Sequence, residues 1–487
     1  MNSSAHACTA NRSPIAAAAA SARRCATRWL AILALASQAA CSTLHYQVNA
    51  PLSEPRETPG YALQNLSAHY NSDSLTVLLA LSGGGYRAAA MSYAVMEVLR
   101  DTTIQWDGHT RSLLQEVDII SAVSGGSLVA AFYAVDPSRF FAEFRPRVLD
   151  HDLQSALVWR WVSPAGMWRL SSATFGRADL LQELLDEQFF GGLTYAALSR
   201  QRPMVFINAT DMRTGDRFEF SQDRFDYLCS DLDRLPIARA VAASMAVPIV
   251  FSPITVWSHA ADCTVAVERH PVSGSASRHR YLHLVDGGLS DNTGVRAALE
   301  NVAAGGGLVA TLQRTGLTGA RKFVQIVVNA QVNADQPEDM SPDTPGLLRQ
   351  LRSAIDVPID RQSASSLQLF GEAVRHWQED LRRADEMKRP VDRVAHEKDF
   401  RVIEIGVSTA RNAAAAEAIQ RIPTGLRITP AQIDAIREFV RSELAANVEW
   451  QHLLAELQGA DSAVAQSGQA LGPQRLDEPS SAQATQP

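Results

Sequence analysis

Cysteine and aromatic residues are scarce in this chain of 487 residues. Five cysteines, 28 glycines and 22 prolines exclude a disulfide-rich scaffold, a collagen-like repeat and a low-complexity chain. Aromatic residues make up only 7%, but 46% of the residues are hydrophobic and 20% are charged, which is the balance of a globular protein with a sizeable core. No internal repeat is visible, and length alone does not decide between one large α/β domain and about two or three smaller domains.

A surplus of basic residues is also missing. The chain holds 52 acidic and 45 basic residues, and four of its arginines lie in residues 1–40, which contain no acid. An acidic body repels a polyanion, so we expect no nucleic-acid partner. Attachment to an anionic membrane then requires an apolar or lipid anchor.

Sequence motifs that hold metals or nucleotides are missing as well. The chain contains no His-Glu-x-x-His pair, no acidic calcium loop, no phosphate-binding Gly-Lys-Ser/Thr and no Gly-x-Gly-x-x-Gly. We therefore expect neither a metal nor a cofactor.

The first 40 residues have the order of an export signal. Arginines precede the apolar run Trp29–Ala36, which is too short to span a bilayer, and small residues lead on to Cys41. We expect removal of residues 1–40 and a lipid on Cys41, which places the protein in a bacterial cell envelope, the outer membrane being favoured. Gln38 stands where lipoprotein signals usually carry an aliphatic residue, so ordinary cleavage near Ala40, with a periplasmic or secreted product, is the alternative. A cytoplasmic protein with an unusual N-terminus is a third interpretation.

The number of cysteines agrees with export. Cys8 and Cys25 would leave with the signal and Cys41 would carry the anchor, so Cys229 and Cys263 remain as a pair. A disulfide between them would close a loop of about 35 residues, worth roughly 3 to 4 kcal/mol. Two separate buried thiols are the alternative.

The pattern along the chain divides it into a polar tether (residues 41–74), a main domain (75–458) and a disordered tail (459–487). Aliphatic runs that enter glycine turns and then helices are typical of a buried parallel sheet. The strand candidates are Leu75–Leu81, Val117–Val123, Met204–Ala209, Phe323–Ala330 and Val402–Ile405. One amphipathic helix is expected around Phe370–Leu381, and another begins at Thr429-Pro430 with a capping residue and a proline in its first turn.

The most informative segment is Ser121–Ser127, between a strand and a helix. Its sequence, Ser-Ala-Val-Ser-Gly-Gly-Ser, fits a nucleophile elbow, in which a serine occupies a strained turn between small residues. Ala122 and Gly126 supply those small residues, and Ser124 is the candidate nucleophile. Free amides at the start of the helix can face a developing negative charge.

Two further glycine turns accompany the elbow. In Ser82-Gly83-Gly84-Gly85-Tyr86-Arg87 the unobstructed amides suit an oxyanion hole or a phosphate cradle. Arg87 has three open roles: it holds the loop, binds a lipid phosphate, or caps the helix. In Asp286-Gly287-Gly288 the glycines let the carboxylate approach its neighbours closely, although this tripeptide is more often a simple turn.

These three segments, in this order, resemble the patatin-like phospholipase family, in a bacterial, lipoprotein-like form. Three further segments match it: Asn208–Asp211, Ala243–Pro248 and Ser290–Asn292. The resemblance is firm over residues 75–295 and looser to residue 444. It implies a three-layer α/β/α fold with a central, mostly parallel sheet, and hydrolysis of lipid acyl esters.

The resemblance also implies the roles of single residues. Ser124 is then the nucleophile and Asp286 its base, a dyad without histidine. The amides of Gly83, Gly84 and Gly85, with Arg87, form the oxyanion region. Alanine at position 122 departs mildly from the family pattern.

A Ser-His-Asp triad is the competing mechanism. His376, His396 and His452 all follow Asp286 along the chain, where an α/β-hydrolase places its histidine. None of the three has the context of a loop at a strand end, so the dyad is favoured.

A helical insertion is expected over residues 136–192. Trp159, Trp161 and Trp168 lie in it, and we interpret it as a cap that lines an acyl-chain channel or touches a bilayer, because tryptophan favours both settings. A helical layer of the core is the equal alternative.

The leading function is therefore an exported hydrolase of phospholipids or lysophospholipids that reaches the membrane through a lipid anchor. An esterase or an acyltransferase on the same site is the near alternative. A non-catalytic surface lipoprotein for binding or assembly is the distant one. Retention of Ser124, Asp286 and the loop glycines argues against the last, because a binding protein has no use for a strained elbow.

Overall fold

The computed structural model describes residues 44–469, except 56–59, 266–278, 333–341, 343 and 387–398. The expected signal, Cys41, His396 and the last part of the expected tail, residues 470–487, lie outside the described residues.

Eight strands of the described chain form one mixed sheet in the order β10-β9-β1-β4-β5-β8-β7, with β6 paired to β5. Neighbours from β10 to β5 are parallel, whereas β8 is antiparallel to both β5 and β7. The strands are β1 (Leu75–Leu81), β4 (Val117–Val123), β5 (Met204–Asp211), β6 (Arg217–Glu219), β7 (Ile254–Trp257), β8 (Tyr281–Asp286), β9 (Lys322–Asn329) and β10 (Asp399–Gly406); β2 (Thr103–Trp106) and β3 (His109–Ser112) form a separate hairpin. The five predicted strands are confirmed.

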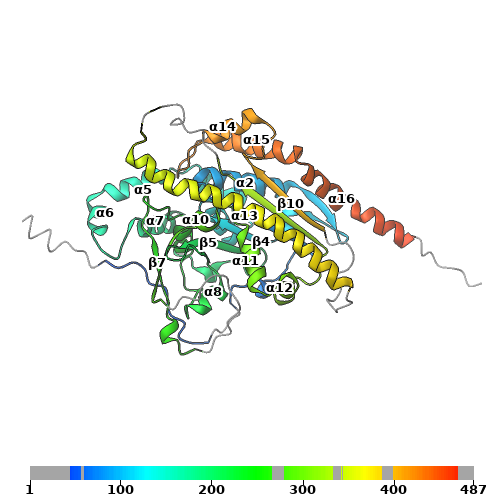
Figure 1. Ribbon diagram of the computed structural model, residues 1–487, viewed down its shortest axis with the longest axis horizontal. Helices are drawn as coiled ribbons and strands as arrows, with labels where there is room; N and C mark the ends of the chain where they lie inside the picture. Colours follow the sequence, from blue (N-terminus) through cyan, green and yellow to red (C-terminus); the bar gives the residue numbers. More distant parts are fainter. Residues whose placement is uncertain are drawn as a thin grey trace, which may run out of the picture.

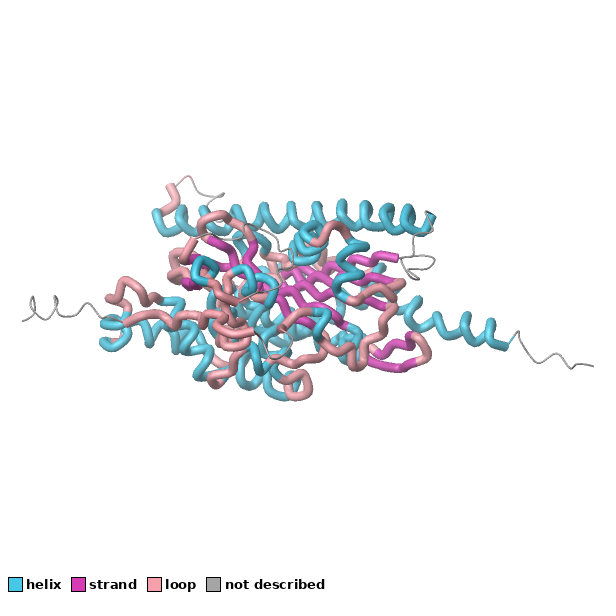
Figure 2. The backbone as a smooth tube through the Cα atoms, turned by 90° about the horizontal axis from the view of Figure 1, so that it is seen from below, coloured by secondary structure: helices cyan, strands magenta, loops and turns pink. Residues whose placement is uncertain are grey.

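Helices cover both faces of this sheet, which confirms the three-layer α/β fold. The long helix α13 runs across one face, and other helices pack on the opposite face (Figures 1 and 2). The helices are α2 (Gly85–Asp101), α3 (Gly125–Val135), α4 (Phe140–Phe144), α5 (Leu153–Val162), α6 (Pro164–Arg169), α7 (Arg177–Leu185), α8 (Gln222–Tyr227), α9 (Ile237–Ser244), α10 (Gly288–Asp291), α11 (Arg296–Ala304), α12 (Leu308–Thr315), α13 (Leu347–Glu386), α14 (Ala413–Gln420), α15 (Pro430–Ala446) and α16 (Val448–Gln469). The expected insertion, 136–192, holds α4 to α7.

The predicted cap of α15 has the expected chemistry. Thr429 accepts a hydrogen bond from the Gln432 amide at 3.3 Å, and Pro430 occupies the first turn. On α13, Phe370 and Trp377 pack edge to face, and Trp377 approaches Phe400 of β10. The apolar stripe predicted for this helix therefore faces the sheet.

The strand register brings the glycine turns together. β1 and β4 are parallel neighbours, so the loops that follow their carboxyl ends meet at one edge of the sheet. On the other side, β5 pairs Asn208 with Val123 of β4 and Ala209 with Asp286 of β8. Strand β5 therefore lies between β4 and β8, and Asp286, the last residue of β8, pairs with the residue that follows the partner of Val123.

The expected polar tether does not hang free where it is described. Asn49 is buried and donates hydrogen bonds to Ser230 Oγ at 2.7 Å and to the Trp257 carbonyl at 3.0 Å. Tyr61 is fully buried, and its hydroxyl accepts a hydrogen bond from the Val205 amide. The polar composition of this segment gave no sign of these buried residues. The tether prediction was therefore wrong for residues 44–55 and 60–74.

The first residues of the expected tail belong to a helix. Helix α16 continues past residue 459 to Gln469.

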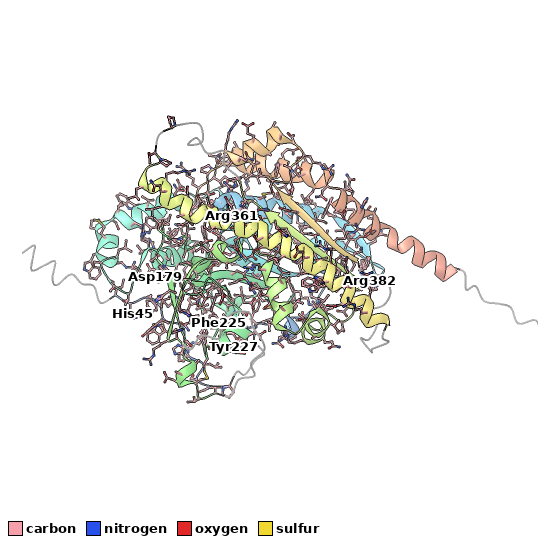
Figure 3. All side chains as sticks on the ribbon, in the orientation of Figure 1. His45, Asp179, Phe225, Tyr227, Arg361 and Arg382 are labelled. Carbon is pink, nitrogen blue, oxygen red and sulfur yellow. A yellow bond between two sulfur atoms is a disulfide. The ribbon has the colours of Figure 1, made fainter. Side chains whose placement is uncertain are left out.

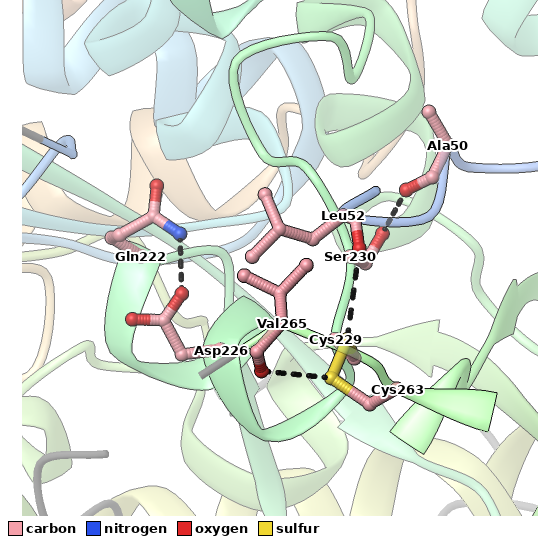
Figure 4. Close-up of a disulfide and its surroundings, with 8 residues drawn as sticks. All are labelled: Ala50, Leu52, Gln222, Asp226, Cys229, Ser230, Cys263 and Val265. Atoms are coloured by element: carbon pink, nitrogen blue, oxygen red, sulfur yellow. Dashed lines mark hydrogen bonds between the residues drawn. A yellow bond between two sulfur atoms is a disulfide. The ribbon is translucent and has the colours of Figure 1, made fainter. Parts of the chain in front are cut away.

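Cys229 and Cys263 are joined by a disulfide, with Cα atoms 5.8 Å apart and a sequence separation of 34 (Figure 4). The N-terminal segment crosses beside it: the Cys229 carbonyl accepts from the Leu52 amide, and Ser230 Oγ donates to the Ala50 carbonyl. The disulfide therefore fixes the loop on which residues 49–52 rest.

Candidate active site

Ser124 occupies the strained turn that the sequence predicts. It stands between β4 and α3 with φ of 50° and ψ of −119°, a conformation that costs a non-glycine residue about 1 to 3 kcal/mol. Its amide donates to Ser244 Oγ at 2.8 Å, and its carbonyl accepts from the amide and hydroxyl of Ser127. These hydrogen bonds stabilise the strained backbone conformation. They use the amide and the carbonyl of Ser124 but not its hydroxyl.

Close packing explains the glycines that follow the serine. A Cβ on Gly125 would lie 2.0 Å from the Gly85 carbonyl oxygen, and a Cβ on Gly126 would lie 2.6 Å from that of Leu81. The elbow and the glycine-rich loop are thus in direct backbone contact.

The glycine-rich loop lies directly against the serine. A Cβ on Gly83 would come within 3.2 Å of Ser124 Cβ, so a side chain there would crowd the candidate nucleophile. Gly84 and Gly85 have φ of 133° and 60°, which glycine adopts readily. Gly84 is the N-cap of α2 and Gly85 its first residue, where helix amides have no intrahelical acceptor.

The three loop glycines are not equivalent. The Gly83 amide already donates to the Asn292 carbonyl at 3.0 Å, so it is not free to bind an oxyanion. The sequence pattern predicted the same role for all three amides. It could not distinguish Gly83, because only the fold brings Asn292 to this loop.

Arg87 does not point a free charge at the site. It is buried, and its Nε, Nη1 and Nη2 donate to the Ala330 carbonyl, the Ile422 carbonyl and Thr424 Oγ1. Burial lowers the pKa of its guanidinium to about 10. Of the roles left open by the sequence, its contacts fit the one that holds the loop, and they contradict its place in the oxyanion region.

Asp286 is held by one carboxylate oxygen. Oδ1 accepts from the Gly288 amide at 2.8 Å, and the Asp286 amide donates to the Ala246 carbonyl. Within the described chain, Oδ2 has no hydrogen-bond partner at ordinary distance and angle, although the Ser124 side chain is close enough to lower the pKa of the carboxyl group. Oδ2 is therefore the oxygen available to a proton from the serine.

Burial sets the acidity of this carboxyl group. Removal from water raises the pKa of Asp286 to about 6, and the Gly288 amide and the Ser124 side chain act in the opposite direction. A carboxylate with this pKa is a better base than an exposed aspartate while still ionised at neutral pH.

Ser244 and Ala246 are parts of the site that the sequence did not assign. Ser244 Oγ accepts from the Ser124 amide and donates to the Asn208 carbonyl at 2.6 Å, and its own carbonyl accepts from Gly287. One short segment thus holds the backbones on both sides of the site. The sequence showed Ala243–Pro248 only as a family match. The hydrogen bond between Ser244 and Ser124 spans 120 residues, so no local sequence pattern predicts it.

Asn292 is a second residue without a predicted role. Its Oδ1 lies 2.3 Å from where a Gly83 Cβ would be and 2.9 Å from where a Gly288 Cβ would be. Its side chain therefore fills the space between the two glycine turns. A side chain at position 83 or 288 would clash with it.

No histidine of the described chain is hydrogen-bonded to Ser124 or Asp286. His376 on α13 and His452 on α16 are exposed. In the same part of the chain, no group of three or more histidine, cysteine or acidic side chains is arranged to hold a metal, and no helix is long and apolar enough to cross a membrane.

A large apolar cavity lies elsewhere. Its volume is about 150 Å³, its lining includes Leu78, Phe206 and Trp377, and neither Ser124 nor Asp286 lines it. It belongs to the layer between the sheet and α13. The loops, and not this cavity, locate the candidate site.

A serine on a strand-turn-helix elbow, beside a glycine-rich loop and a buried carboxylate, defines an α/β hydrolytic site. Residues 79–299 match the model of the patatin family, described as patatin-like phospholipase. The chain thus contains a patatin-like phospholipase domain, which indicates a lipid acyl hydrolase.

Other comparisons add only a distant likeness. No curated protein matches the chain. Among solved structures, the crystal structure of VipD from Legionella pneumophila is similar at 13% identity, covering 84% of this chain and 73% of that chain with a TM-score of 0.27.

Proposed function

We propose that this protein is an exported phospholipase A or lysophospholipase that works through a Ser124–Asp286 dyad. The observation that carries the proposal is the pairing of a strained serine with a buried carboxylate whose Oδ2 has no other partner in the described chain. The patatin-like domain supplies the class of substrate, a lipid acyl ester.

The first half of the reaction forms an acyl-enzyme. Ser124 Oγ attacks the ester carbonyl carbon while its proton passes to Asp286 Oδ2, because a carboxylate is too weak a base to ionise serine beforehand. The amides of Gly84 and Gly85 face the oxyanion that develops on the carbonyl oxygen. The tetrahedral intermediate then collapses, and Asp286 returns the proton to the departing alcohol.

The second half releases the fatty acid. Water attacks the acyl carbon, gives a proton to Asp286 Oδ2, and the collapsing intermediate frees the carboxylic acid as Ser124 recovers its proton. Asp286 acts in both halves, so its loss should slow both.

Export completes the proposal. The signal-like N-terminus, the remaining cysteine pair and its disulfide favour an oxidising compartment. We place the enzyme in the bacterial envelope, attached through Cys41, with a periplasmic or secreted form as the alternative.

The test is hydrolysis of phosphatidylcholine and of lysophosphatidylcholine by the full-length chain. Ser124→Ala and Asp286→Asn should each lose at least about a thousandfold in kcat with folding intact. His376→Ala is the matched control, because an exposed histidine outside the site should change little.

Three outcomes would overturn parts of the proposal. A loss of several hundredfold in His376→Ala or His452→Ala would replace the dyad by a triad. Activity on short soluble esters alone would favour the esterase. No turnover of any ester by a folded protein would favour the surface lipoprotein.

A further inference from the structure

The helices α5 and α6 project an apolar surface into solvent. Their exposed side chains include Trp159 at 74%, Met167 at 57% and Trp168 at 53% exposure. Two residues of a neighbouring turn, Ile249 and Val250, are also exposed. We call this surface the tryptophan patch: Val158, Trp159, Val162, Met167, Trp168, Ile249 and Val250.

The α5–α6 corner is rigid. Ser163 caps α6 by accepting from the Gly166 amide, and a Cβ on Gly166 would lie 1.8 Å from the Arg160 carbonyl oxygen. Arg169 forms an ion pair with Glu183 of α7, and Arg160 forms one with Glu187, just after α7 ends. The exposed tryptophans are therefore presented by a fixed scaffold, at little cost in conformational entropy when they bind.

The 249–250 turn is fastened to the same corner. Arg177 donates to the Ile249 carbonyl at 2.7 Å, and its guanidinium lies over the Trp161 ring. Trp161 in turn packs edge to face on Phe251. The turn that carries Ile249 and Val250 is thus joined to α5 and α7 through Arg177 and Trp161.

The patch adjoins the candidate active site on two sides. Ser244 and Ala246, which hold the backbones of Ser124 and Asp286, come only a few residues before Ile249. At the start of α5, the Gln154 amide donates to the Leu426 carbonyl, next to Gly425, which packs on Gly85. The segments that carry the patch are therefore linked to the backbone around the site.

The N-terminal segment reaches the foot of the same corner. The Leu44 carbonyl accepts from Ser172 Oγ at 2.6 Å and from Thr174 Oγ1 at 2.9 Å, just after α6 ends. Gln182 of α7 donates to Gln47. His45 lies on the α7 side of the molecule, near Asp179 (Figure 3). Cys41 is three residues before Leu44, so a lipid on Cys41 would enter its membrane within about 10 Å of this turn.

We propose that the tryptophan patch inserts into the bilayer that holds the Cys41 lipid, so that anchor and patch orient the active site toward that membrane. The proposal rests on the proposed lipid hydrolase and its anchor.

The chemistry of the patch favours insertion over charge attraction. Tryptophan is the residue most favoured at the lipid interface. The arginines nearest the patch are already engaged, Arg160 and Arg169 with glutamates and Arg177 with an indole ring, and the chain carries a net charge of −7. Binding should therefore not require anionic lipid.

The test is flotation of the full-length chain with phosphatidylcholine vesicles. Cys41→Ser removes the anchor and Ser124→Ala prevents lipid turnover in every sample. Adding Trp159→Ala and Trp168→Ala should lower the vesicle partition coefficient by about 10- to 100-fold, whereas Trp159→Phe with Trp168→Phe should retain most of it. Tyr70→Ala is the matched control, because Tyr70 is 57% exposed beside the opposite ends of the strands.

Thermal melts must show that all variants fold. Equal vesicle binding by the alanine pair and by Tyr70→Ala would overturn the proposal. It would also be overturned if the protein bound only anionic vesicles, not phosphatidylcholine vesicles, and if 0.5 M salt abolished that binding. A dimer that the alanine pair dissociates, without vesicle binding by either form, would assign the patch to a second copy of the chain and also overturn it.

Failure of this inference is distinguishable from failure of the proposed function. With Ser124 intact, the alanine pair should lower the ratio of vesicle to soluble-ester hydrolysis. Patch-dependent binding by a chain that cleaves no ester would leave this inference standing and refute the hydrolase. Ester cleavage with patch-independent binding would do the reverse.

Discussion

Asp286→Asn should abolish activity and at the same time stabilise the protein, to a degree that depends on pH. Burial raises the pKa of Asp286 from its ordinary 3.8 to about 6, so the folded state disfavours the ionised form. A difference of about two pKa units between the unfolded and folded states corresponds to about 3 kcal/mol. Asparagine carries no charge to bury, and its Oδ1 can still accept from the Gly288 amide.

The sign follows from the direction of the pKa change. Below pH 3.8 the carboxyl group is protonated in both states and costs nothing, whereas above about pH 6 it is ionised in both and its burial cost is complete. The wild type therefore loses about 3 kcal/mol relative to Asp286→Asn as the pH rises across this interval.

Thermal and urea unfolding between pH 4 and pH 8 measure this difference. For about 400 ordered residues, 3 kcal/mol corresponds to a Tm difference of roughly 3 to 4 °C at pH 8. Other buried acids titrate alike in both proteins and cancel. Ser124→Ala should show a pH dependence at least as large as that of the wild type, because the Ser124 side chain lowers the pKa of Asp286. A difference that is missing at pH 8, or equal at every pH, would refute the assignment of a costly buried carboxylate to Asp286.

Four further predictions follow from the site and its supports. Values of kcat/KM should fall tenfold per pH unit below about pH 6, the pKa of Asp286; a rate that stays flat to pH 5 would contradict a base with this pKa. Ser244→Ala should lower kcat by about 10- to 100-fold with little change in KM, because it removes the hydrogen bond that holds the Ser124 amide. Steady-state kinetics across pH check this, and the midpoint of the pH profile should stay unchanged. Arg87→Lys should lower the free energy of unfolding by about 3 kcal/mol or more, because one ammonium cannot replace three engaged donors; a melt like that of the wild type would show that the loop does not depend on it. Cys229→Ser with Cys263→Ser should cost roughly 3 to 4 kcal/mol in urea unfolding, and the reducing agent that lowers wild-type stability should leave this double variant unaffected.

Much of the fold follows from local pattern. The runs that became β1 and β4 are continuously aliphatic, which predicts strands buried on both faces. The glycine turns after them follow strand ends, so the positions of the loop and the elbow at one sheet edge were predictable. The cap of α15 could be located to the residue.

The remaining features depend on contacts between distant segments. The hydrogen bond between Ser244 and Ser124 exists because α9 ends beside the elbow, and nothing local to residue 244 announces it. Arg87 could be placed on a helix start, but its three acceptors come from residues 330, 422 and 424, far along the chain. Tyr61 lies in a polar stretch, so its burial could not be predicted from composition.

The central claim is that Ser124 is a nucleophile activated by Asp286. An active-serine phosphonate probe on the full-length chain, followed by peptide mapping, tests it most directly. We predict modification at Ser124, lost in Ser124→Ala and nearly lost in folded Asp286→Asn, but kept in His376→Ala. Modification that survives in Asp286→Asn, or a folded protein that takes up no probe at Ser124, would contradict the account.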